Sequence, residues 1–289
     1  MTSTIAGAEI PIKPRLLYMM TIGMFGGLCE FIVYMGAAGF DVSFIASPGP
    51  EMKSASEEGV SVYGVAMKRD ISPLSDLVSL WRIWRIMRNT RPDITNVGTP
   101  KAGLLGGSAA VLTGVQYRIY TMHGLRLETS RGWKRKLLWC SEWLSCRCAH
   151  QVYCVSHSLC GRAIELKLVS PAKSSVIANG TFNGIEIDRY SPNSERKEKA
   201  IEIRRELSID LNALVVGFVG RMTRDKGIQE LYQAYLMLHE QFTDLRLLLV
   251  GEYESGDPIW LVTRSGSLLP CHGCARNAHA SRRLRSGFD

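Results

Sequence analysis

Short apolar runs alternate with helix-length segments along most of this chain, and this alternation constrains its fold more than any other feature. The continuous apolar run at 15–21 has the composition of a strand buried on both faces, and strands are also expected at 41–46 and 60–65. Further strands are expected at 92–97, 117–122 and 151–156, and helices at 75–91, 102–112 and 132–149. Because strands and helices alternate at this pace, the sequence predicts an α/β fold whose N-terminal domain is a doubly wound parallel sheet.

The C-terminal third begins a second domain of the same class. A linker at 171–192, which includes a short strand at 174–177, is followed by a charged helix at 195–207. A strand at 213–220, a helix at 227–242 and a strand at 245–251 then start another Rossmann-like unit. The expected domains are therefore 1–190, a partial domain at 191–259, and a tail at 260–289 without regular structure. The tail has five Arg, no Lys and no periodicity, and we expect it to result from a frameshift or truncation.

Composition indicates a cytoplasmic protein without a nucleic-acid partner. The net charge is +8, but half of it lies in the tail, so the rest of the chain is only mildly basic. Eight cysteines form no even framework of the kind that small secreted domains use, which favours reduced thiols. The N-terminus has no signal-peptide pattern, and the apolar stretch at 16–40 contains Glu30 and five glycines, which favours a strand, a turn and a packed helix over a membrane span.

Two candidate sites follow predicted strands of the first domain. Gly26 and Gly27 lie in a turn between a strand and a helix, where glycines let a ligand approach the backbone, although an ordinary tight turn has the same pattern. His123, followed by Arg126 and Glu128, comes directly after the predicted strand at 117–122. Ligands of open α/β sheets bind at the carboxyl ends of the strands, so this histidine is a candidate for contact with a substrate.

A third candidate lies in the second domain. Arg221 and Lys226 are in the turn between the strand at 213–220 and the next helix. Cations at a helix N-terminus are suited to a diphosphate, although a solvated basic turn has the same pattern. A Cys271–Cys274 pair could be half of a zinc site, but no second cysteine pair follows it, and no metal is expected.

Seven segments together carry a family resemblance. They are RPDI at 91–94, TPKAGLLG at 99–106, HGLRLET at 123–129, VSHS at 155–158, NGIE at 183–186, GFVGRMTRDKG at 217–227 and LVGEYESGD at 249–257. In this order they resemble the family-four retaining glycosyltransferases of the two-domain GT-B fold, of the bacterial capsule, exopolysaccharide and lipid-linked oligosaccharide type.

The resemblance implies sugar transfer from a nucleotide-sugar, a UDP-sugar, with retention at the anomeric carbon and without a metal or cofactor. Arg221 and Lys226 would bind the donor diphosphate, His123 would lie beside the transferred sugar, and Gly26 and Gly27 would line the cleft. The basic aromatic helices at 81–91 and 133–147 would rest on the inner face of the plasma membrane, where a polyprenyl-linked or saccharide acceptor is presented.

One departure from the family concerns the donor site. The family's second domain continues into a pair of glutamates that bind the donor ribose and sugar, and nothing similar follows Ile259 in this sequence. The resemblance therefore implies an enzyme with an incomplete donor site and little activity of its own. The alternative is a non-catalytic module that binds an acceptor or a partner enzyme.

Overall fold

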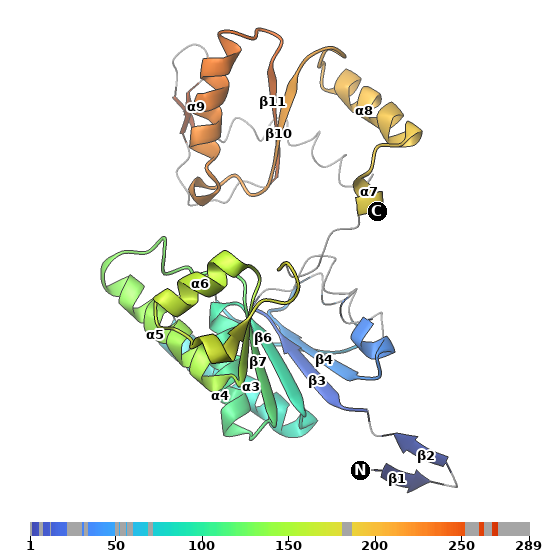
Figure 1. The fold of residues 1–289 in the computed structure, drawn as a ribbon, viewed down its shortest axis with the longest axis vertical. Helices are drawn as coiled ribbons and strands as arrows, with labels where there is room; N and C mark the ends of the chain where they lie inside the picture. The colour runs from blue at the N-terminus through green and yellow to red at the C-terminus, as the bar shows by residue number, and fades with distance from the viewer. Residues whose placement is uncertain are drawn as a thin grey trace. The chain divides into compact units, whose positions relative to one another are not determined.

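The computed structural model describes residues 2–5, 8–11, 13–21, 31, 34–49, 52, 56, 60–68, 72–180, 187–251, 260–262 and 268–270. The chain divides into two compact units, Met1–Ile185 and Glu186–Asp289 (Figure 1). The division falls inside the predicted linker, five residues before the expected boundary at 190. Each unit is described by itself.

A seven-stranded parallel sheet forms the centre of the first unit (Figure 1). Its strand order is β5-β4-β3-β6-β7-β8-β9, so the order reverses between β3 and β6. The strands are β3 (Arg15–Met19), β4 (Asp41–Ala46), β5 (Ser61–Gly64), β6 (Ile94–Gly98), β7 (Tyr117–Met122), β8 (Gln151–Cys154) and β9 (Ser174–Ser175). This confirms the predicted α/β fold with a doubly wound parallel sheet. A separate antiparallel hairpin, β1 (Thr2–Ile5) with β2 (Ala8–Pro11), precedes the sheet.

Side chains of the central strand β3 enter two different cores, because alternate residues of a strand point to opposite faces. Leu17 and Met19 belong to the larger buried cluster, whereas Tyr18 and Met20 belong to a smaller one with Phe44. A strand buried on both faces needs an unbroken apolar run, which explains the composition of 15–21.

Four helices cover the face of the larger cluster: α3 (Pro73–Thr90), α4 (Pro100–Leu112), α5 (Gly132–Cys148) and α6 (His157–Glu165). Helix α4 packs against both α3 and α5. Its glycines make this close packing feasible. A Cβ atom on Gly103 would lie 2.7 Å from Tyr120 Cε2, and one on Gly106 would lie 2.8 Å from Val97 Cγ1. The Gly- and Ala-rich composition of α4 is therefore a packing requirement.

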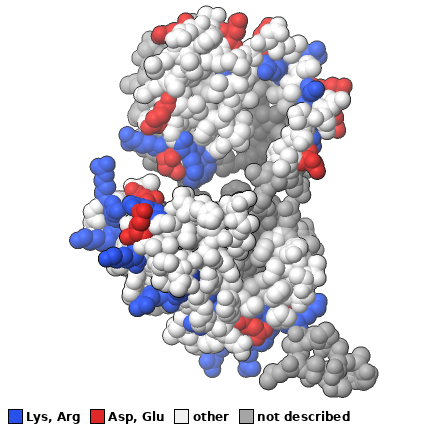
Figure 2. All heavy atoms as spheres, viewed as in Figure 1, with Lys and Arg blue, Asp and Glu red and all other residues white. Residues whose placement is uncertain are grey.

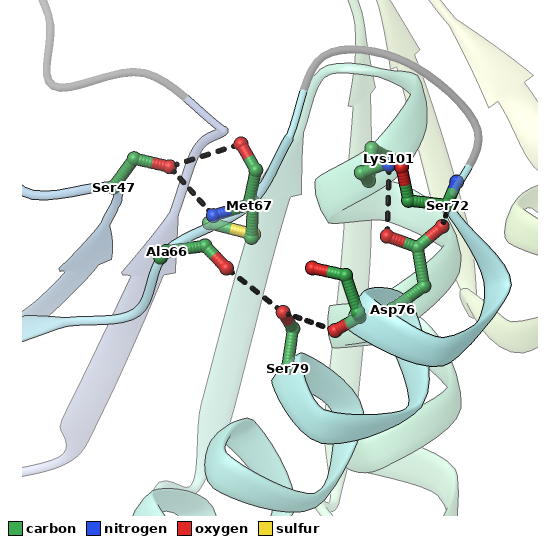
Figure 3. A network of polar contacts seen from close by, with 8 residues as sticks. Ser47, Ala66, Met67, Ser72, Asp76, Ser79 and Lys101 are labelled. Atoms are coloured by element: carbon green, nitrogen blue, oxygen red, sulfur yellow. Dashed lines mark hydrogen bonds and ion pairs between the residues drawn. The ribbon is translucent and has the colours of Figure 1, made fainter.

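A polar network fixes the N-terminal ends of α3 and α4 (Figure 3). The Asp76 carboxylate accepts a hydrogen bond from the Ser72 backbone N–H at 3.2 Å and pairs with Lys101 Nζ at 2.8 Å. Ser79 Oγ, on a side chain buried in α3, lies 2.8 Å from the carbonyl oxygen of Ala66. Since Ala66 follows β5 and Lys101 follows β6, the network joins both helices to the carboxyl edge of the sheet.

The second unit contains two paired parallel strands and three helices among its described residues. Strand β10 (Val215–Val219) pairs with β11 (Arg246–Val250), and α9 (Ile228–His239) connects them through the short 3-10 helix η2 (Arg224–Lys226). Helices α7 (Ile187–Tyr190) and α8 (Ser194–Glu206) precede them. Two short strands, β12 (Trp260–Val262) and β13 (Leu268–Pro270), pair antiparallel in the stretch where no regular structure was expected.

No helix among the described residues has the length and apolar character needed to cross a bilayer.

Candidate functional site

The carboxyl edge of the first unit's sheet brings together polar groups from strands that lie far apart in sequence. Thr21 follows β3 and Thr99 follows β6, the two strands between which the strand order reverses. Their hydroxyl oxygens lie 2.5 Å apart, and the Thr21 backbone N–H donates to Thr99 Oγ1 at 3.3 Å. In open α/β sheets, ligands bind at this reversal point.

Thr99 has an unusual backbone conformation. Its φ of 69° and ψ of 148° lie in a region that residues other than glycine rarely adopt. Thr99 precedes Pro100 and is the N-cap residue of α4, but its side chain makes no capping hydrogen bond because its hydroxyl is directed to Thr21. Such backbone strain persists where the surrounding structure enforces it, and it is frequent at functional sites.

His123 lies at the same edge, directly after β7. A Cβ atom on Gly98 would lie 2.9 Å from His123 Nε2, so the imidazole occupies the space that a side chain at position 98 would fill. Burial lowers the pKa of His123 below its usual value of 6.5. The ring is therefore neutral at pH 7, with one nitrogen able to donate a hydrogen bond and the other able to accept one.

Arg126 and Glu128 lie in the loop after His123. The loop is anchored by the buried side chains of Leu125 and Leu127, whereas Arg126 and Glu128 are exposed. Glu128 Oε1 pairs with Arg162 Nε of α6 at 2.8 Å. The carboxylate thus links this loop to α6, and this contact was not foreseen from the sequence.

The other two cleft candidates, Gly26 and Gly27, lie outside the described residues. No group of three or more His, Cys, Asp and Glu side chains that could hold a metal ion occurs in the part of the chain that the structure describes.

The basic turn of the second unit presents its charged side chains outward. Met222 and Thr223 are buried and fix the turn, whereas Arg221 and Lys226 are exposed. A hydrogen bond with Thr223 and then the charges of Lys226 and Arg221 lower the pKa of Asp225, so the turn holds a carboxylate among its cations.

Glycines shape both ends of this turn. Gly227, with φ at 70°, is the N-cap residue of α9. Gly220 extends the strand pairing through a hydrogen bond from its N–H to the Val250 carbonyl at 2.9 Å. Cations beside the N-terminus of α9 form a surface suited to an anion.

The structure therefore places the sequence candidates in two groups. His123, Arg126 and Glu128 belong to the first unit, and Arg221 and Lys226 belong to the second. Sequence reasoning missed Thr21, Gly98 and Thr99. The signal that could have indicated Thr99 is its position directly after a strand and directly before Pro100.

Comparison with known proteins identifies the family. A family model described as "Glycosyl transferase 4-like domain" matches residues 27–180, more than half of the chain. The chain belongs to this glycosyltransferase family, as its sequence motifs predicted.

Two curated relatives extend this match. Capsular polysaccharide biosynthesis glycosyltransferase CapM of Staphylococcus aureus is 35% identical over 229 residues, which cover 79% of this chain and 58% of CapM. UDP-Gal:alpha-D-GlcNAc-diphosphoundecaprenol alpha-1,3-galactosyltransferase of Escherichia coli is 26% identical over 224 residues, which cover 74% of this chain and 55% of the relative. The chain thus spans a little over half the length of these relatives.

The fold is shared with a solved structure, Anabaena Alr3699/HepE in complex with UDP and glucose. The two have a TM-score of 0.66 and 18% sequence identity, over 96% of this chain and 67% of that one. The likeness confirms the predicted GT-B-like fold class.

Proposed function

We propose that this chain carries the acceptor-side domain, and the beginning of the donor-binding domain, of a retaining glycosyltransferase. The donor is a nucleotide-sugar, specifically a UDP-sugar, and the acceptor is a polysaccharide or a lipid-linked saccharide. The names of the Staphylococcus aureus and Escherichia coli relatives and the UDP and glucose in the Anabaena structure support these substrate classes. The observation that carries the proposal is the neutral imidazole of His123 at the carboxyl edge of the sheet.

His123 is the group that contacts the transferred sugar. Its ring is largely buried and neutral, so it can hydrogen-bond a sugar hydroxyl without bringing a cation into the site. Gly98 leaves room for the ring, and the Thr21–Thr99 contact holds the neighbouring loops in place. These features orient a donor sugar for transfer.

Arg221 and Lys226 hold the donor diphosphate. Negative charge accumulates on this diphosphate as the bond to the sugar breaks, and fixed cations stabilise that charge. Their exposed position, beside the N-terminus of α9, leaves both side chains accessible to a nucleotide. In this proposal no metal ion and no cofactor take part.

Helix α5 forms a peripheral contact with an anionic membrane. Its first turns expose Trp133, Lys134, Arg135, Lys136 and Leu137. The only acidic residue of α5, Glu142, is buried, so the exposed side of this helix carries no negative side chain. Figure 2 shows basic side chains gathered along the side of the first unit where α5 lies. Exposed indole and lysine side chains together favour the headgroup region of an anionic bilayer.

The donor site is tested by UDP binding to the full 289-residue chain. We expect calorimetry to detect UDP binding, and expect Arg221→Ala and Lys226→Ala each to weaken it about tenfold, as for a charge-assisted hydrogen bond. Lys197→Ala, on the exposed surface of α8, is the matched control and should bind like the wild type. Equal UDP affinity in all four proteins would refute the assigned diphosphate contacts.

Catalysis is tested separately with UDP-sugars and a polyprenyl-diphosphate-linked acceptor. Because the resemblance implies an incomplete donor site, we expect only slow transfer, in which His123→Ala reduces kcat about 100-fold while His123→Gln, which retains a hydrogen-bonding group, loses less. A chain that binds the acceptor lipid equally well with and without His123, and never releases UDP, would instead be the non-catalytic binding module.

The membrane contact is tested by co-sedimentation with vesicles at low salt. We expect binding to phosphatidylglycerol vesicles that is lost in the triple variant of Lys134, Arg135 and Lys136 to Gln, and no binding to phosphatidylcholine vesicles. If the wild type ignores both vesicle types, the membrane contact is wrong while the donor site stands.

A further inference from the structure

A concave site lies at the amino edge of the first unit's sheet, away from His123. It is a cavity of about 390 Å³ between the last turns of α5 and α6 and the segment 168–173. Helix α5 ends just before β8 begins, and Lys173 directly precedes β9. Since the amino ends of parallel strands share one edge, this cavity is at the opposite edge from the Thr21–Thr99 contact.

Three cations line the cavity: Arg147, Lys167 and Lys173. None of them forms an ion pair with a carboxylate of the described residues. Burial first, and also the guanidinium groups of Arg147 and Arg118, lower the pKa of Lys173, so positive charge is crowded around its ammonium group.

The negative ends of two helix dipoles, those of α5 and α6, offset part of this positive charge. Lys173 Nζ donates to the Arg147 carbonyl oxygen at 3.4 Å, and Lys167 lies just beyond the end of α6. Each helix C-terminus contributes about half a negative charge, so the two together offset only one of the three cations. A surplus of roughly two positive charges remains, which corresponds to a dianion.

The cationic wall is preorganised. The Arg147 guanidinium lies over the Trp143 ring at 5.2 Å, and Trp143 stacks on Trp139 with 6.3 Å between the ring centroids. Trp139 Nε1 in turn donates to the Leu166 carbonyl oxygen at 2.9 Å. This chain of contacts limits the motion of Arg147, so little entropy is lost when it binds a ligand.

Lys167 is held in a strained conformation. Its φ of 56° is in the left-handed region, and its N–H donates to the Ile164 carbonyl at 2.9 Å. Glycine is the usual residue at such a helix end, and a lysine there costs about 1 kcal/mol. A side chain retained at this cost, on the rim of a cationic cavity, indicates a role in binding.

Apart from Ser170, the remaining lining residues are apolar. Leu168 and Val169 are buried, and the Trp143 ring forms one wall. We propose that this cavity binds a phosphate group that is carried on an apolar or aromatic body. The site is independent of the proposed sugar transfer, since it shares no residue with the carboxyl edge or with the Arg221–Lys226 turn.

The test compares three soluble probes in calorimetric titrations of the full chain: phenyl phosphate, inorganic phosphate and benzyl alcohol. We expect phenyl phosphate to bind most tightly, because it alone engages both the cations and the apolar wall. Lys167→Gly is the decisive variant. It removes the charge and relieves the strained backbone, so we expect unchanged or higher thermal stability together with a loss of affinity of about tenfold.

Controls separate binding from folding and identify the source of the phosphate. Lys197→Gln, on the exposed surface of α8, should bind phenyl phosphate within about twofold of the wild type, whereas Lys173→Gln should weaken it about tenfold. Vesicles that contain phosphatidic acid form a second arm, in which Lys134, Arg135 and Lys136 are all replaced by Gln so that the proposed membrane contact of α5 does not mask the result. Binding to these vesicles alone, lost in Lys167→Gly, assigns the phosphate to a lipid, and binding of phenyl phosphate assigns it to a soluble ester. The proposal is overturned if neither probe binds, or if Lys167→Gly binds as well as the wild type.

Discussion

The hydroxyl oxygens of Thr21 and Thr99 lie 2.5 Å apart although the two residues are 78 positions apart in the chain. Each follows one of the two central strands, β3 and β6, between which the strand order of the sheet reverses. The contact therefore joins the residues that follow these two neighbouring strands. It lies at the same carboxyl edge of the sheet as His123.

Two substitutions at Thr99 separate the energetic cost of its strained backbone from the contribution of its hydrogen bond to Thr21. Thr99→Ala loses the hydrogen bond to Thr21 and keeps the strained φ, so we expect a loss of about 1–2 kcal/mol in the free energy of unfolding. Thr99→Gly loses the same hydrogen bond but relieves strain worth about 1 kcal/mol or more, and should be less destabilised. Urea unfolding measures both. A glycine variant no more stable than the alanine variant would show that position 99 stores no strain.

Two glycines in helices should respond oppositely to alanine. A Cβ atom at Gly106 of α4 would lie 2.7 Å from Met19 Sδ and 2.8 Å from Val97 Cγ1, so Gly106→Ala should destabilise the protein by about 1–3 kcal/mol. Gly161 of α6 has no atom within 4 Å of such a Cβ, so Gly161→Ala should stabilise it by about 0.5–1 kcal/mol. Thermal unfolding of the pair distinguishes packing from helix propensity, and equal shifts would contradict the close packing of α4.

Glu142 should make stability depend on pH. Its carboxyl group is buried in α5 and accepts a hydrogen bond from Tyr120 Oη at 2.7 Å. Burial raises its pKa from 4.5 to about 7, while the Tyr120 hydrogen bond acts in the opposite direction. The folded state therefore holds the proton more tightly than the unfolded state. The protonated Glu142 carboxyl group therefore contributes its full stabilisation below pH 4.5. As the pH rises to about 7, the free energy of unfolding falls by on the order of 3 kcal/mol.

Two variants test this assignment in urea titrations between pH 4.5 and 8. Glu142→Gln keeps the shape and an acceptor for Tyr120 but cannot titrate, so the decline should be absent. Tyr120→Phe removes the hydrogen bond that favours the carboxylate, so the decline should extend to higher pH. A Glu142→Gln protein with the wild-type pH dependence would assign the effect to another group.

Gly251 should be essential to the second unit alone. A Cβ atom on this residue would lie within 2 Å of the Gly220 carbonyl oxygen, and its φ of 151° is unfavourable for other residues. We expect Gly251→Ala to disrupt the pairing of β10 with β11, seen as faster hydrogen exchange at Val215–Val219, with the exchange of β3 and β7 unchanged. Gly217→Ala, at a position with open space around its Cβ, is the control. Retained protection in Gly251→Ala would contradict the close approach of the two backbones.

Several strands of the sheet were predicted well, because each has apolar residues that become buried in the sheet. The strands 41–46 and 117–122 were predicted residue for residue, and α5 within one residue. Helix α6 was missed since it is short and begins with polar residues. Its detectable signal was Ser156, whose Oγ accepts a hydrogen bond from the Leu159 N–H at 3.2 Å and caps the helix.

The apolar pattern of α3 showed that it is a helix without showing which face is buried. Its helical spacing was recognised from six apolar residues, Leu77, Leu80, Trp81, Trp84, Ile86 and Met87. Of these, Met87 is buried but Leu77 and Trp81 are exposed, and Ile83, which was not in the set, is buried. The packing direction depends on α4, which a single helix pattern does not include.

Only part of the candidate site could be predicted from the sequence. The position of His123 could be predicted, since it follows a strand of a parallel sheet. The Thr21–Thr99 contact and the cationic cavity could not, because each depends on segments brought together only by the strand order and on backbone angles that the residue types do not reveal.

All seven strands of the first unit's sheet point the same way, so the loops that follow their carboxyl ends all start at one edge of the sheet. Most core residues lie in the strands and helices, but the loop after β7 contributes Leu125 and Leu127 to the larger buried cluster. The exposed positions of this loop, Arg126 and Glu128, could therefore be changed without redesigning the core, provided that Leu125 and Leu127 are kept. Within one short loop, alternate residues therefore have different tasks: the buried leucines fix its path, and the exposed charged side chains are presented to solvent.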